Sequence, residues 1–200
     1  MTVYLLHGFN VADAGKDTIG TLEPYLDFKD VIREDYGWVG LVRLVTVNRR
    51  TIRRLCEMLR PGDIIIGHSN GCWIANQIAH LYSHLGAVVC INPALRKDTT
   101  WPKELPVLCL HNKKDYVVQM GRLWAELFTF FNPDDMPHGW GAAGRWGFEQ
   151  KSVINWDTND ESKWAVTSTG HSGVFKSAKF WGEHINDWLK KYARPLSVEE

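Results

Sequence analysis

The sequence has no long hydrophobic run and no excess of charge of either sign. No apolar stretch approaches the ~20 residues that a membrane-spanning helix needs. No basic segment followed by an apolar stretch opens the chain, so we expect a cytoplasmic protein that has no membrane partner. Lys plus Arg and Asp plus Glu each number 23, so the formal net charge is zero and predicts no general attraction to nucleic acid.

Cysteine is scarce, and the usual metal-binding spacings are missing. The four cysteines are widely separated, and three of them lie among apolar residues, where cysteine behaves as a small hydrophobic side chain. They are Cys56, Cys72, Cys90 and Cys109. Neither His-Glu-x-x-His nor paired Cys-x-x-Cys occurs. We therefore expect reduced core thiols, no metal and no other cofactor.

Length and pattern indicate one α/β domain over residues 1–200. The chain is 44% apolar and 23% charged, which is enough apolar residues for a sizeable core. Short apolar runs alternate with helical patterns, as in a mostly parallel, doubly wound sheet with crossover helices. The predicted strands are near 2–7, 41–47, 63–68, 87–91 and 107–111. The predicted helices are near 18–28, 50–59, 70–84, 118–130 and 175–192.

The most informative segment is 63–73, in which an apolar run leads directly into Gly-His-Ser-Asn-Gly. A serine between a buried strand and a helix must sit on a sharp, strained bend for its hydroxyl to project outward. Gly67 and Gly71 permit that bend because neither has a Cβ atom. The start of the following helix would direct free amide groups at the reacting centre, as an oxyanion requires. The pattern favours a serine hydrolase with Ser69 as nucleophile.

Three other segments extend this interpretation. The first strand ends in His-Gly, so the backbone amide of Phe9 is a candidate oxyanion donor beside that of Asn70. Asp115 follows the strand at 107–111, and His171 lies in a loop of small residues before the last helix. The chain order of the three chemical groups is therefore Ser, Asp, His.

This order and these contexts resemble the α/β-hydrolase superfamily over nearly the whole chain. The resemblance implies that Ser69 is the nucleophile, His171 the general base and acid, and Asp115 the group that orients the histidine. It also implies a compact version of the fold that lacks the first strands of larger members. Asp157 and Asp160 are rival acids, since they are nearer to His171 in sequence.

The segment 132–163 departs from the alternating pattern and is rich in glycine, proline and aromatic residues. We expect a lid-like insertion here, in which Trp140 and Trp146 contact the substrate. The alternative is that its aromatic residues only fill space beside the sheet. His7 and His68 are expected to support the site without reacting. The arginines at 49, 50, 53 and 54 are expected to form a solvated helix face, although a phosphate site is the other interpretation.

The function that these residues predict is hydrolysis of a small-molecule carboxylic ester, or thioester, through an acyl-enzyme. Acyl transfer by the same triad is one alternative. A non-catalytic protein that binds a small ligand on the same fold is another, because fold does not imply function. A short sheet edge can pair with a second copy, so a homodimer is left open.

Overall fold

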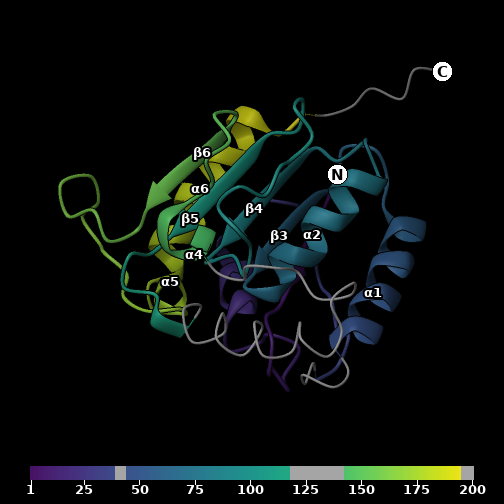
Figure 1. The fold of residues 1–200 in the computed structure, drawn as a ribbon, viewed down its shortest axis with the longest axis horizontal. Coiled ribbons are helices and arrows are strands. Elements are labelled where there is room, and N and C mark those ends of the chain that lie inside the picture. The colour runs from purple at the N-terminus through teal and green to yellow at the C-terminus, as the bar shows by residue number, and fades with distance from the viewer. Residues whose placement is uncertain (39–43, 118–141, 195–200) are drawn as a thin grey trace.

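The computed structural model describes residues 1–38, 44–117 and 142–194. Its centre is one all-parallel, six-stranded sheet in the order β2-β1-β3-β4-β5-β6 (Figure 1). The strands are β1 (Thr2–Leu6), β2 (Asp30–Arg33), β3 (Ile64–His68), β4 (Ala87–Ile91), β5 (Val107–His111) and β6 (Val153–Asp157). The parallel, doubly wound α/β architecture predicted from the sequence is confirmed.

Helices cover both faces of the sheet. They are the 3-10 helix η1 (Ile19–Tyr25) and the α-helices α1 (Leu44–Met58), α2 (Asn70–Leu81), α4 (Ala142–Trp146), α5 (Gly173–Lys176) and α6 (Ala178–Tyr192). Helices α1 and α2 pack on one face with α4, and η1, α5 and α6 pack on the other. All the strands point the same way, so the loops that follow them meet at one edge, where ligands bind in such sheets.

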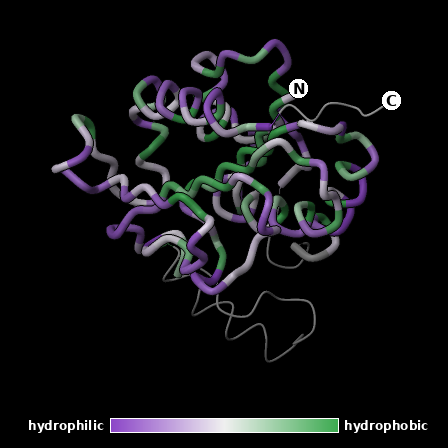
Figure 2. The backbone as a smooth tube through the Cα atoms, turned by 90° about the horizontal axis from the view of Figure 1, so that it is seen from above, coloured by the Kyte–Doolittle hydropathy of each residue, from purple (hydrophilic) through white to green (hydrophobic). Residues whose placement is uncertain are grey.

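Alternation along the central strands explains the two-sided core. In β1, Tyr4 and Leu6 join the α1–α2 side, whereas Val3 and Leu5 join the α6 side. The same division of alternate residues holds in β3, β4 and β5, as the two-residue repeat of a strand requires. Figure 2 shows these strands as hydrophobic segments through the middle of the molecule. Both faces are buried, so the strands read as continuous apolar runs.

The strand predicted at 41–47 is wrong where the structure describes it, because α1 begins at Leu44. Its β-branched residues favour a strand locally, but the buried positions downstream follow helical spacing. Asn48, Thr51, Ile52 and Leu55 are buried and lie on one face of the helix. Packing of that face against the sheet outweighs the local strand preference.

Two strands were not predicted, and both are at the sheet edges. Strand β2 has three exposed residues among its four, so it lacks the apolar run that marks a central strand. Strand β6 lies inside the segment expected to be an insertion, and it pairs in parallel with β5. That part of 132–163 therefore belongs to the sheet. The predicted helix at 118–130 lies outside the described residues.

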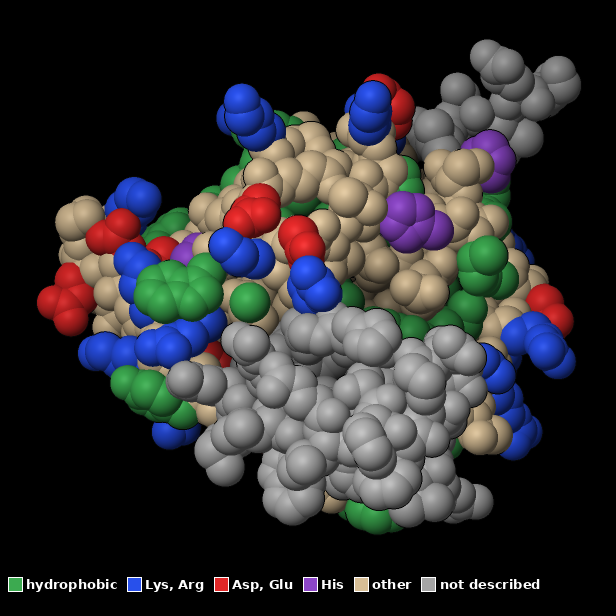
Figure 3. Space-filling view, in the orientation of Figure 1, with side chains coloured by type: hydrophobic (Ala, Val, Ile, Leu, Met, Phe, Trp, Pro, Cys, Tyr) green, Lys and Arg blue, Asp and Glu red, His purple; other side chains and the backbone are tan. Residues whose placement is uncertain are grey.

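Acidic and basic side chains are interspersed on the face shown in Figure 3. Within the described ranges, no helix is both long and apolar enough to cross a membrane.

Candidate active site

Ser69 occupies a strained turn between β3 and α2. Its backbone angles are φ 54° and ψ −114°, a conformation that a residue with a Cβ adopts at a cost. A Cβ on Gly67 would lie 2.7 Å from the carbonyl group of Gly71, and one on Gly71 would lie 2.3 Å from the carbonyl oxygen of Leu6. The two glycines therefore let β1, β3 and α2 converge at the serine, as the sequence predicted.

The loop after β1 lies against Ser69. A Cβ on Gly8 would be 3.1 Å from the Cβ of Ser69, which places the Gly8–Phe9 peptide next to that serine. Asn70 is the first residue of α2, so its amide is at the positive end of that helix dipole. The structure thus brings both segments of the predicted oxyanion hole to the serine, while the role of the two amides stays a prediction.

A buried amide pair holds Asn70. Its side chain and that of Asn48 on α1 exchange two hydrogen bonds, of 3.0 and 3.1 Å. Both residues are almost completely buried. Sequence reasoning missed Asn48, because an asparagine within a helix has no distinguishing spacing. The pair ties α1 to the residue that follows Ser69.

Asp115 and His171, which are 56 positions apart in the sequence, form a close pair. The Nδ1 atom of His171 lies 2.7 Å from Oδ2 of Asp115. Asp115 is fully buried, and the side chain of His171 is 14% exposed. Asn92, at the end of β4, donates to the same carboxylate oxygen over 3.1 Å. A buried carboxylate that accepts from Nδ1 holds the imidazole in one orientation and leaves Nε2 able to accept a proton.

The rival acids have other partners. Asp157 forms an ion pair with Lys113 at 2.7 Å, and Asp160 pairs with Lys163 at 3.2 Å. Asp115 is therefore the carboxylate that the structure brings to His171.

Asn112 joins the loops that carry the acid and the histidine. Its side-chain amide donates to the carbonyl oxygens of Ser168 (3.1 Å) and Gly170 (3.2 Å). Its side-chain oxygen accepts from the amide of Lys114 at 2.9 Å, directly before Asp115. Asn112 is fully buried. The sequence contains a weak sign of this role, since Asn112 directly follows a buried strand, at the edge where the loops after the strands meet.

His68 contacts His171 through a hydrogen bond to its backbone and through its ring. Its Nε2 atom lies 3.2 Å from the carbonyl oxygen of His171, and the two rings are 4.7 Å apart between centroids. Phe175 on α5 packs edge-on against the His68 ring. Burial, and then the nearby His171, hold the pKa of His68 well below its ordinary value. A neutral His68 donates from Nε2 and so links the serine turn to the histidine loop.

No hydrogen bond joins Ser69 Oγ to His171 in the part of the chain that the structure describes. Catalytic hydrogen bonds are often longer without substrate than in the complex. The contacts of His68 nevertheless place the His171 loop beside the serine turn.

Two tryptophans were predicted to bind the substrate, and no contact among the described residues brings either of them to Ser69. Trp140 lies outside the described residues. Trp146 ends α4 and is 55% exposed, with the Arg145 guanidinium 5.1 Å from its ring centroid. A substrate contact by either tryptophan stays a prediction. Within residues 1–38, 44–117 and 142–194, no group of three or more His, Cys, Asp or Glu side chains could hold a metal ion.

No protein-family model matches this sequence, and no curated protein matches it significantly. Solved structures do match. A putative hydrolase of the alpha/beta superfamily from Xanthomonas campestris pv. campestris is 17% identical, with a TM-score of 0.52 over 94% of this chain and 99% of the other. An esterase from Pyrococcus furiosus is 14% identical, with a TM-score of 0.58 over 96% of this chain and 82% of the other. Alpha/beta hydrolase domain-containing protein 10 from mouse is 15% identical, with a TM-score of 0.54 over 95% and 90%. The sheet order, the serine turn and these similarities together show that the chain has the α/β-hydrolase fold.

Proposed function

We propose that this protein is a serine hydrolase that cleaves a carboxylic ester through a Ser69–His171–Asp115 triad. The observation that carries the proposal is the 2.7 Å contact between His171 and the fully buried Asp115, on a loop linked to the Ser69 turn by His68. A surface histidine has no need of a buried carboxylate. A general base does, because the carboxylate stabilises the imidazolium that forms during reaction.

The first half of the reaction forms an acyl-enzyme. His171 takes the proton of Ser69 on Nε2 as Oγ attacks the ester carbonyl carbon. The amides of Phe9 and Asn70 donate to the resulting oxyanion, and each such donor lowers the barrier by about 3 kcal/mol. The tetrahedral intermediate then collapses, the C–O bond to the alcohol breaks, and His171 returns the proton to the departing oxygen.

Water completes the cycle through the same groups. His171 accepts a proton from water as the water oxygen attacks the acyl carbon. Collapse of the second intermediate breaks the bond to Oγ, and the proton returns from His171 to Ser69. The products are the carboxylic acid and the free enzyme.

A fluorophosphonate probe tests the nucleophile directly. We expect it to label Ser69 in the wild type and to fail with Ser69→Ala and His171→Ala. Hydrolysis of p-nitrophenyl acetate should be lost in the same variants. Circular dichroism should show that both variants remain folded. Labelling of a residue other than Ser69 would overturn the assignment of the nucleophile.

The two alternatives give other results. A folded wild type that neither reacts with the probe nor releases p-nitrophenol would support a binding protein on this fold. Ester cleavage that yields mainly an acylated alcohol, when an alcohol is added as competing acceptor, would support acyl transfer.

A further inference from the structure

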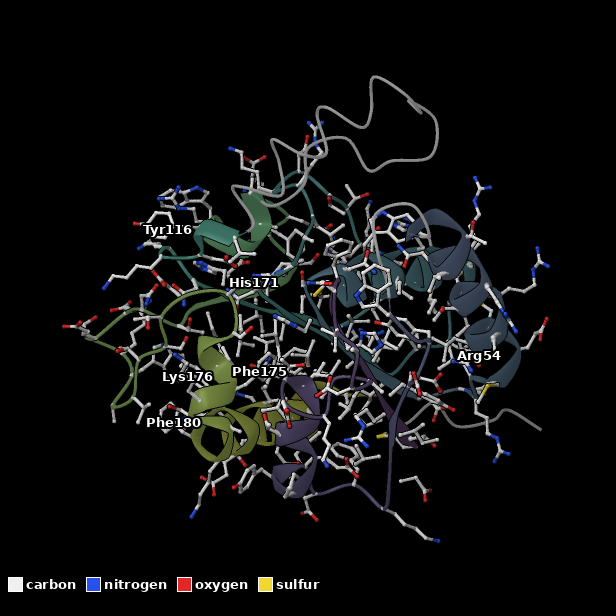
Figure 4. The ribbon with its side chains drawn as sticks, turned by 90° about the horizontal axis from the view of Figure 1, so that it is seen from below. Arg54, Tyr116, His171, Phe175, Lys176 and Phe180 are labelled. Carbon is white, nitrogen blue, oxygen red and sulfur yellow. The ribbon has the colours of Figure 1, made fainter. Side chains whose placement is uncertain are left out.

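A cavity of about 360 Å³ lies between α1 and the loop that follows β2. This volume is within the range of small-molecule sites. The lining residues are Asp35, Tyr36, Gly37, Trp38, Val47, Arg50, Thr51 and Arg54. In Figure 4, Arg54 projects from α1 near the edge of the molecule, and His171 lies near its centre. The cavity is therefore on the α1 side of the candidate active site.

The two elements that form the walls of this cavity, the loop after β2 and α1, are hydrogen-bonded to the two segments of the predicted oxyanion hole. The Tyr36 hydroxyl donates to the carbonyl oxygen of His7, and the two rings stack with their centroids 3.9 Å apart. The indole nitrogen of Trp38 donates to Oδ1 of Asn10 over 2.7 Å. These contacts flank Phe9 in the chain. On the other wall, α1 also carries Asn48, which holds Asn70. A group in the cavity is thus next to the elements that would bind the oxyanion.

The direction of an ester in the site follows from proton transfer. The oxygen of the leaving group must lie within hydrogen-bond reach of His171, which returns the proton to it. The leaving group therefore occupies the His171 side. The acyl chain would then leave the carbonyl carbon on the other side. The cavity, whose lining residues Tyr36 and Trp38 bind His7 and Asn10, lies on that side.

The charges in the cavity leave one cation without an ionic partner. Arg54 forms an ion pair with the buried Glu34. Arg50 forms no ion pair within the described ranges. Asp35 is exposed, and its carboxylate accepts a hydrogen bond from the amide of Gly37 over 2.9 Å. Asp35 would repel any anion, and a doubly charged phosphate more strongly than a carboxylate, so a single guanidinium suits a ligand with one negative charge better.

We propose that this cavity binds a carboxylate at the end of the substrate's acyl chain, and that Arg50 is its main ligand. The preferred substrates are then monoesters of dicarboxylic acids. The inference deepens the proposed esterase function and rests on it. All four arginines of α1 are exposed, as the sequence-based interpretation expected, and the inference gives one of them, Arg50, a ligand.

Matched ester pairs test this specificity. The p-nitrophenyl monoesters of succinate, glutarate and adipate would be compared with the neutral p-nitrophenyl butanoate, pentanoate and hexanoate. We expect the wild type to show a higher kcat/KM for the charged member of at least one pair. Arg50→Gln should lower that charged-to-neutral ratio about tenfold or more, which is the scale of one hydrogen bond to a charged group. Arg50→Glu should lower it further.

Arg53→Gln is the matched control, because Arg50 and Arg53 are both exposed arginines of α1 and only Arg50 lines the cavity. It should leave the ratio unchanged. Equal losses in Arg50→Gln and Arg53→Gln would show a general effect of surface charge and would overturn the proposal, as would a wild type that prefers the neutral esters.

A binding measurement separates this inference from the esterase proposal. Calorimetric titration of Ser69→Ala with glutarate, succinate and adipate should show binding of at least one diacid, and Ser69→Ala/Arg50→Gln should bind it about tenfold or more weakly. Arg50-dependent binding in the Ser69→Ala background, together with a wild type that hydrolyses none of the esters, would overturn the esterase proposal and leave the carboxylate site standing. Turnover of neutral esters, without any binding or preference that depends on Arg50, would overturn the carboxylate site and leave the esterase proposal standing.

Discussion

Replacement of Asn112 by alanine should weaken both the fold and the reaction. The change removes the donor to Ser168 and Gly170 and the acceptor of Lys114. Two of these groups keep another partner, since Asn159 donates to the Ser168 carbonyl and accepts from the Lys114 amide. Gly170 loses its bond to this side chain. At about 1 kcal/mol per hydrogen bond, the three lost bonds cost at most about 3 kcal/mol, and the one bond without a replacement costs about 1 kcal/mol. We therefore expect a loss of about 2 kcal/mol.

The expected kinetic effect comes from the position of Asn112 between the loops that carry Asp115 and His171. Its loss frees the His171 loop from the Asp115 loop, and a displacement of about 1 Å at a reacting group can reduce a rate about a hundredfold. Urea unfolding and kcat/KM for p-nitrophenyl acetate measure the two effects. The control is Asn159→Ala, which removes a partly buried side chain that contacts the same carbonyl. A stability loss below about 0.5 kcal/mol together with unchanged kcat/KM would refute the reasoning.

Three other changes test separate parts of the site. Asp115→Asn should lower kcat by about 10⁴-fold with little loss of stability, because an amide favours the wrong histidine tautomer. An unaltered kcat would show that Asp115 is not the acid of the triad. Gly71→Ala should cost about 3 kcal/mol by urea unfolding, because its Cβ meets the Leu6 carbonyl oxygen at 2.3 Å. Burial lowers the pKa of His68, so the unfolded chain binds the proton more readily and stability is lost as pH falls below about 6.5. His68→Gln should flatten that dependence by up to about 1.4 kcal/mol per pH unit, and an unchanged slope would contradict it.

The central strands and the serine turn could be predicted because their signals are local. Strands β3, β4 and β5 are buried on both faces, so each reads as a short apolar run. The turn at Ser69 needs glycines at fixed positions, because a Cβ at either one meets backbone atoms. Both features, the apolar run and the glycine pattern, can be recognised in a few consecutive residues.

The edges and the supporting contacts could not be predicted, because they depend on distant partners. Strand β2 is too exposed to show an apolar pattern, and β6 is recognisable only through its pairing with β5. The partner of Asn48 is 22 positions away, and the two carbonyl groups that Asn112 binds are 56 and 58 positions away. The cavity beside Arg50 combines residues from a loop and a helix, so its arginines look like any charged helix face in the sequence.

The two sides of Ser69 are held by separate polar contacts. Asn112 fixes the loops of Asp115 and His171, whereas Asn48 fixes the residue after the nucleophile. In the described ranges these two asparagines share no hydrogen-bond partner. Losses of stability in Asn48→Ala and Asn112→Ala should therefore add within about 0.5 kcal/mol in the double variant. A larger coupling would mean that the acid–base side and the oxyanion side move as one unit, so that an acyl group bound beside α1 could also adjust the position of His171.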